Sequence, residues 1–104
     1  MPLQLTALHL LEGTQIQVMF NDGRCAAVDL APLLNGPVFR ELQHPDAFRG
    51  CRLDPDLGTV VWPNGADLAP EAIYFQAFRD DPSLTQLFER WGYLPAGSTS
   101  ATQR

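Results

Sequence analysis

The segment TQIQVMFNDGRCAAVDL, residues 14–30, has the pattern of a β-hairpin. Apolar and polar positions alternate through its first half, so one face of the first strand would carry Ile16, Val18 and Phe20. Alternation of this kind is typical of a half-buried strand. The following Asn21-Asp22-Gly23 supplies the positive φ angles of a tight turn. A second strand over 24–30 would then return beside the first.

The opposite face of the returning strand carries small, uncharged residues, Cys25 and Ala27. Since a solvent-facing strand surface is usually polar, we expect a helix or a second subunit to pack there. An earlier strand over 3–11 changes its apolar phase between residues 7 and 8. This change predicts a β-bulge near Ala7 or burial of both faces.

The rest of the chain predicts short helices and a second hairpin. Helical turns are expected over 31–34, 37–43 and 45–48, and two further strands over 51–54 and 59–62, joined by a loop over 55–58. Proline at the first helical position indicates a helix over 70–78, with its N-cap at Ala69.

The last predicted helix covers 82–91, with Asp81 as its N-cap and Gly92 as its C-terminal glycine. It carries one apolar stripe: Leu84, Leu87, Phe88 and Trp91. We expect this stripe to dock on the chain's own sheet, or alternatively on another chain.

These elements predict a single α+β domain over residues 1–94. Its core would be an antiparallel sheet of about five short strands, a three-stranded meander plus a hairpin. The short helices and the C-terminal helix would pack chiefly on one face. Residues 95–104 are small and polar and are predicted to form a disordered tail.

Composition argues against nucleic-acid and membrane roles. The formal charge is −5, and the seven basic residues are all arginines scattered along the chain, whereas nucleic-acid binding needs clustered cations. The sequence has no signal-peptide pattern and no apolar run near the roughly 20 residues of a membrane helix. We therefore expect a cytoplasmic protein, with Cys25 and Cys51 as reduced thiols.

Chemistry-bearing residues do not form a recognisable site. His9, His44, Cys25 and Cys51 lack the closely spaced pairs of structural zinc ligands. A nucleophile with a flanking motif, a dinucleotide fingerprint and a phosphate-binding loop are all missing from the sequence. We expect no catalytic, cofactor-binding or metal-binding residues, and a protein that is not an enzyme.

The candidate interaction surface consists of Trp62, Asn64, Asp67 and Glu71. Tryptophan is a frequent anchor at protein interfaces. Each of the four also has a structural explanation, which we favour: Trp62 as a core residue, Asn64 as a turn residue, and the two acids as helix-end electrostatics.

Residues 18–23, 28–30, 33–34 and 38–42, and above all the run VWPNGADLAPE at 61–71, resemble the bacterial domain of unknown function 2442 family. The resemblance covers about residues 3–75, which leaves the helix at 82–91 outside it. Some members continue into a helix-turn-helix DNA-binding region, for which this chain is too short. The family has no established reaction.

The resemblance implies a binding role, because family members are similar to small operon partners encoded beside another short protein. We therefore expect a protein–protein interaction module, either an operon partner or an antitoxin-like binder of a neighbouring gene's product, and a homodimer is an open alternative. The other hypotheses are a DNA-binding transcriptional regulator and a small-molecule binder with a pocket near Trp62.

Overall fold

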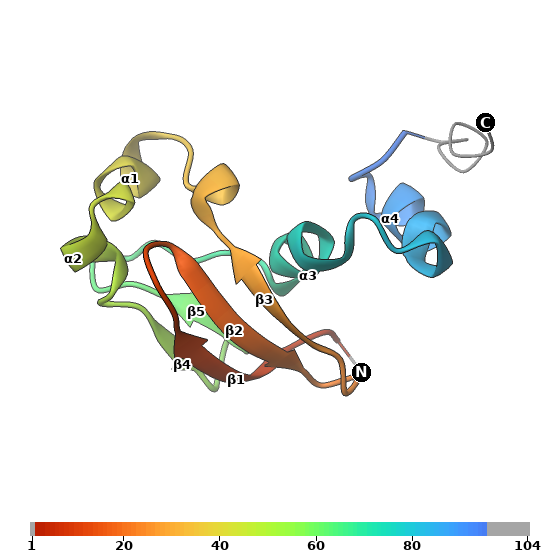
Figure 1. Cartoon of the computed structure of the whole chain (residues 1–104), viewed down its shortest axis with the longest axis horizontal. Coiled ribbons are helices and arrows are strands. Elements are labelled where there is room, and N and C mark those ends of the chain that lie inside the picture. Colours follow the sequence, from red (N-terminus) through yellow and green to blue (C-terminus); the bar gives the residue numbers. More distant parts are fainter. Residues whose placement is uncertain (1, 96–104) are drawn as a thin grey trace.

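The predicted hairpin forms two strands of a three-stranded antiparallel sheet. In the computed structural model, which describes residues 2–95, the strands β1 (Leu5–Leu10), β2 (Gln15–Phe20) and β3 (Cys25–Asp29) lie in the order β1-β2-β3 (Figure 1). Gly23 has φ +91°, and its amide donates to the carbonyl of Phe20 at 3.0 Å, which closes the turn. The pairing of β1 with β2 shifts register between Leu5 and Ala7, so the predicted bulge is confirmed.

The second hairpin consists of β4 (Arg52–Asp54) and β5 (Thr59–Val61) and forms a separate two-stranded sheet. It lies behind the first sheet in the view of Figure 1. The two sheets meet where the amide of Leu5 donates to the carbonyl of Gly58 at 2.8 Å. The prediction of five short antiparallel strands in an α+β fold is confirmed, and the strands divide between two sheets.

Four short helical segments connect the two sheets: η1 (Ala31–Leu33), α1 (Pro37–Arg40), η2 (Glu41–Gln43) and α2 (Pro45–Phe48). Helices of this length are not stable alone, so packing must hold them. The packing that holds them includes three buried apolar side chains of this region, Leu34, Leu42 and Phe48.

Two longer helical segments follow β5. The helix α3 (Pro70–Phe78) begins after Ala69, as predicted, and η3 (Pro82–Leu84) leads into α4 (Thr85–Trp91). The Asp81 side chain accepts from the amide of Ser83 at 2.9 Å, and Gly92 ends α4 with φ +86°. Both predicted cap residues are thus confirmed.

The apolar stripe of α4 packs on α3, which lies between α4 and the sheet (Figure 1). The ring of Tyr74 on α3 contacts Phe20 of β2, with centroids 4.9 Å apart, and also lies 6.2 Å from Phe88 and 5.9 Å from Trp91 of α4. The adjacent Phe75 contacts Phe88 at 4.9 Å. The expected docking of the stripe on the sheet is therefore indirect, because aromatic side chains of α3 lie between α4 and β2.

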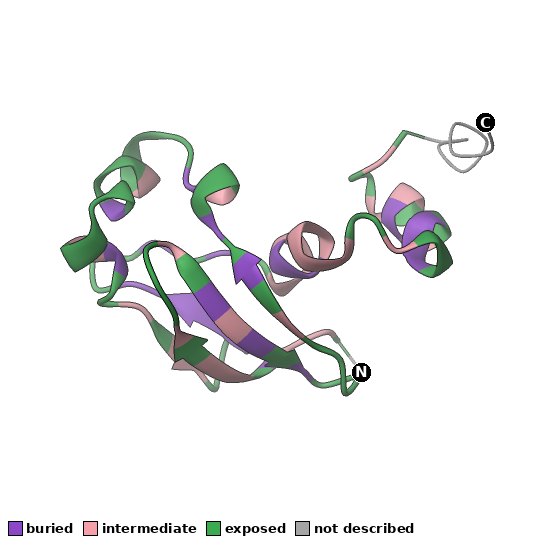
Figure 2. Ribbon diagram, viewed as in Figure 1, coloured by how far each residue is buried: buried purple, intermediate pink, exposed green. Residues whose placement is uncertain are grey.

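One apolar cluster extends from the sheet to α4 and includes the fully buried Ile16, Phe20, Phe48, Ile73 and Phe88. Along β2, buried positions alternate with exposed or half-buried ones, as the sequence alternation predicts (Figure 2). Of the predicted tail at 95–104, all but Pro95 lies outside the described residues. Within residues 2–95, no helix has both the length and the apolar character that crossing a membrane requires.

Candidate binding surfaces

Trp62 belongs to the core and is only 3% exposed. Its indole Nε1 donates to the carbonyl of Phe48 at 2.9 Å. Its ring packs against Phe39 and Phe48, with centroids 6.4 and 5.8 Å away. The structural explanation of Trp62 therefore holds, and the ring is not presented to a partner as an anchor.

Asn64 lies in the turn after β5 and holds that turn in place. Its Nδ2 donates to the carbonyl of Val38 at 3.1 Å, and its Oδ1 accepts from the amide of Ala66 at 3.0 Å. Asp67 is exposed and forms an isolated β-bridge with Val61, while Glu71 lies half-buried in the first turn of α3. Asn64 and Asp67 are exposed and Glu71 is half-buried, whereas Trp62 is buried, so the four residues do not form one surface patch.

An open cleft of about 410 Å³ lies beside Asn64, between the η2–α2 segment and the turn after β5. It is lined by Glu41, Leu42, Asp46, Ala47, Gly50, Pro63 and Asn64. Glu41 and Asp46 are exposed, and neither forms an ion pair with another residue of the described chain. Sequence reasoning placed a pocket near Trp62 but missed these two acids, because only the fold brings residues 41–50 beside residues 63–64.

The outer face of the three-stranded sheet is the second candidate surface. Strand register places Ala7, Met19 and Cys25 in one row, and His9, Gln17 and Ala27 in the next. These six residues, which we call the outer-face cluster, lie opposite the buried Ile16 and Val18. Met19 is 44% exposed, and no helix or strand covers this face in Figure 2. A small depression of about 120 Å³ runs between β1, β2 and β3 there.

The outer-face cluster contains no aspartate, glutamate, arginine or lysine. Sequence reasoning identified its small β3 members, Cys25 and Ala27, as a packing surface. It did not identify Ala7 as their neighbour, because the bulge in β1 decides which side chains of that strand share the face.

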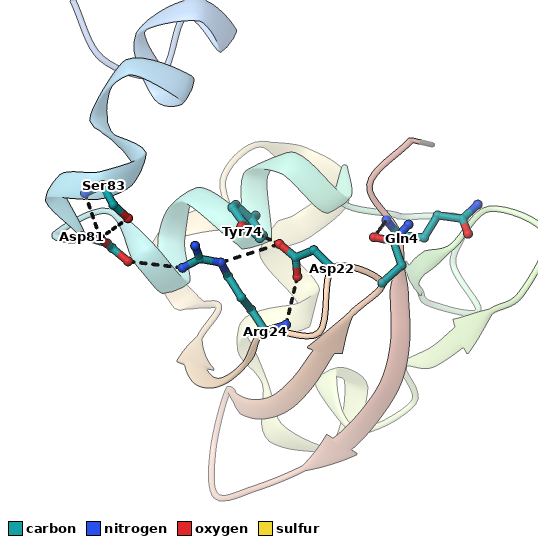
Figure 3. A network of polar contacts seen from close by, with 7 residues as sticks. Gln4, Asp22, Arg24, Tyr74, Asp81 and Ser83 are labelled. Atoms are coloured by element: carbon teal, nitrogen blue, oxygen red, sulfur yellow. Dashed lines mark hydrogen bonds and ion pairs between the residues drawn. The ribbon is translucent and has the colours of Figure 1, made fainter.

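A polar network ties the β2–β3 turn to α3 and η3 (Figure 3). The Tyr74 hydroxyl donates to Asp22 Oδ2 at 2.7 Å, and Arg24 Nη1 lies 3.3 Å from Asp81 Oδ2. Burial, together with the hydrogen bond to the Asp22 carboxylate, raises the pKa of Tyr74 to about 12. Because these four side chains all have partners within the network, the network has a structural role, which is to position α3.

The residues of the rejected zinc hypothesis are distributed over the fold. His9 and Cys25 belong to the outer-face cluster, His44 precedes α2, and Cys51 precedes β4. Within residues 2–95, groups of three or more His, Cys, Asp or Glu side chains placed to hold a metal ion do not occur.

A family model described as a protein of unknown function (DUF2442) matches residues 5–79, which covers both sheets and α3. The chain belongs to the DUF2442 family. The resemblance seen in the sequence is thus confirmed. A search of curated proteins gave no match.

Among solved structures, this DUF2442 protein is similar to the crystal structure of "Putative DNA Binding Protein NE0471" from Nitrosomonas europaea ATCC 19718. The TM-score is 0.67 at 18% sequence identity, over 89% of this chain and 63% of that chain. At this identity the similarity shows a shared fold. The DUF2442 chain spans less than two thirds of the NE0471 structure.

Proposed function

We propose that this DUF2442 protein is a protein-binding module whose binding surface is the outer-face cluster of β1, β2 and β3. The observation that supports this most directly is the absence of aspartate, glutamate, arginine and lysine among these six neighbouring, largely solvent-facing residues. The solvent face of an antiparallel sheet is normally polar. Protein interfaces, by contrast, have cores depleted of charged residues and enriched in methionine.

The position of Met19 fits this role. It lies on the central strand, between Ala7 and Cys25, so its flexible side chain projects from a surface of small neighbours. Methionine adapts to irregular partner surfaces, and small flanking residues let a partner approach closely. The proposal is for binding and not for catalysis, in the cytoplasm, with the product of a neighbouring gene as partner, as the family resemblance suggests.

Co-purification of the full chain with the product of the adjacent gene tests the proposal. We expect Met19→Lys to weaken the complex by about tenfold or more, because it places a charge in the centre of the desolvated face. The matched control is Leu57→Lys, since Leu57 is 54% exposed and lies in the β4–β5 turn, away from the outer face.

Thermal melts of both variants establish that each is folded. Equal binding by Met19→Lys and the wild type would contradict the proposed surface. The proposed protein-binding function would be wrong if the wild type did not bind that partner and light scattering showed only a monomer. A wild-type dimer that Met19→Lys dissociates would identify the partner as a second copy.

DNA binding is the second candidate, because the similar NE0471 structure is named for it. The charge of −5 and the presence of one basic residue, Arg90, on α4 oppose it. A gel shift with the chain's own promoter fragment at low salt tests this function. A shift that Arg90→Gln abolishes would favour it over protein binding.

A further inference from the structure

We propose that the cleft between the η2–α2 segment and the turn after β5 receives an arginine or lysine side chain of a partner protein. This cleft is a different surface from the outer-face cluster, and different residues carry the inference. It therefore goes beyond the proposed function and can fail without it.

The lining of the cleft matches the two parts of a long basic side chain. Leu42, Ala47 and Pro63 supply apolar walls, against which the methylene stem of such a side chain packs favourably. Glu41 and Asp46 supply carboxylates that would accept charge-assisted hydrogen bonds from its head group. The volume of about 410 Å³ is within the range of small-ligand pockets, so one side chain fits.

Both carboxylates are available for this role. The ion pairs within residues 2–95 use Asp22, Asp54 and Asp81, and leave Glu41 and Asp46 without a cationic partner. The nearby Arg49 forms no ion pair with either acid among the described residues, and its Nη1 donates to the carbonyl of Leu11 at 3.2 Å. Two carboxylates that form no ion pair within the described residues therefore line the cleft, in a protein whose formal charge is −5.

The walls of the cleft are held in place before any partner binds. The Nδ2 of Asn64 ties one wall to the carbonyl of Val38, and its Oδ1 holds the turn by accepting from the amide of Ala66. At Gly50 the two walls nearly touch, since a Cβ built there would lie 3.4 Å from the Ala47 carbonyl oxygen and from Pro63 Cδ. A preformed site loses little conformational entropy when a side chain enters.

A titration of the ¹⁵N-labelled full chain, followed by NMR, tests the inference. The probe is the capped tripeptide acetyl-Gly-Arg-Gly-amide, and the control is the same peptide with citrulline, which is close in shape but uncharged. We expect saturable shifts of the Ala47, Gly50 and Asn64 amides with the arginine peptide, with a Kd on the order of 1 mM, and weaker shifts with citrulline.

Two variants distinguish a specific site from general attraction to an acidic protein. Glu41→Gln with Asp46→Asn is expected to weaken binding by about three- to tenfold. Glu12→Gln with Asp56→Asn removes two exposed charges outside the cleft and is expected to leave binding unchanged. Gly50→Leu, which fills the cleft where ordinary contacts surround its Cβ, is expected to abolish the shifts.

Three results would overturn the inference. They are the absence of saturable shifts with the arginine peptide, equal binding of the citrulline peptide, and equal weakening by the two charge-removing variants. Saturable binding that depends on Glu41 and Asp46 supports it, whether or not Met19→Lys affects the complex with the neighbouring gene's product.

Discussion

The hydroxyl of Tyr74, on α3, lies 2.7 Å from Oδ2 of Asp22, in the turn between β2 and β3. The two residues are 52 positions apart in the sequence. Asp22 thereby has two structural roles, because its Oδ1 also accepts from the amide of Arg24 at 2.9 Å within the turn. The hairpin turn and the docked helix share one carboxylate, so the formation of each supports the other.

Tyr74→Phe removes the hydroxyl while keeping the ring that packs on Phe20. We expect it to lower the free energy of unfolding at pH 7 by about 1 kcal/mol, the usual net contribution of one hydrogen bond. The loss stays this small because water can solvate the partly exposed Asp22 carboxylate once the hydroxyl is gone. Urea unfolding measures the change. The control is Tyr93→Phe, since Tyr93 is 38% exposed, and an equal loss in both variants would contradict a specific role for the Tyr74 hydrogen bond.

The same tyrosine predicts how stability depends on alkaline pH. Its pKa is about 12 in the folded protein and about 10 in an unfolded chain, so folding favours the protonated hydroxyl. Its contribution to stability is complete below pH 10 and is lost as pH rises towards 12. Between pH 10 and 12, the free energy of unfolding should fall less steeply with pH for Tyr74→Phe than for the wild type. Urea unfolding at several pH values measures this. The residual slope should include Tyr93, whose pKa burial also raises.

Local patterns predicted most of the fold, and long-range contacts were the part that they could not supply. The turn role of Asp22 follows from the Asn-Asp-Gly sequence alone. Its bond to Tyr74 depends on where α3 docks, and the many apolar residues of that helix do not predict which of them faces the sheet. Likewise, the sequence does not indicate that Glu41 and Asp46 line a cleft, because Pro63 comes to the other side of it only through tertiary packing.

Trp62 shows where the sequence left two explanations and burial decided between them. Trp62→Phe would leave the Phe48 carbonyl without its indole donor and create a void, so we expect a loss of about 2–3 kcal/mol in unfolding free energy. Circular dichroism during denaturation measures it without relying on tryptophan fluorescence. A loss below about 0.5 kcal/mol would be typical of a surface residue and would contradict the core role.

The two cysteines should differ in their reaction with thiol reagents. Cys25 is exposed in the outer-face cluster, whereas Cys51 is half-buried and burial raises the pKa of its thiol. Because the thiolate is the reacting form, we expect Cys25 to be labelled first at pH 8. Mass spectrometry after brief iodoacetamide treatment measures the order, with Cys25→Ser and Cys51→Ser as matched controls. Faster labelling of Cys51 would mean that the packing around β4 opens readily.

Two glycines in turns next to β5 provide a matched comparison of backbone strain and steric contact. Gly58 has φ +68° and Gly65 has φ +90°, so alanine at either position adopts a conformation that costs about 1–2 kcal/mol. Nothing lies within 4 Å of a Cβ built at Gly65. At Gly58 the added carbon would lie 2.6 Å from Gln4 Cγ and 2.9 Å from Gln4 Cβ.

We therefore expect Gly58→Ala to destabilise the protein by at least about 1 kcal/mol more than Gly65→Ala. The excess arises because relief of the clash must move residue 4 or residue 58, next to the Leu5–Gly58 hydrogen bond that joins the two sheets. Adding Gln4→Gly should recover part of the excess in Gly58→Ala and none of the loss in Gly65→Ala. Equal losses in the two alanine variants, measured by urea unfolding, would show that strain alone is at work and that the contact between β1 and the β4–β5 turn tolerates the extra carbon.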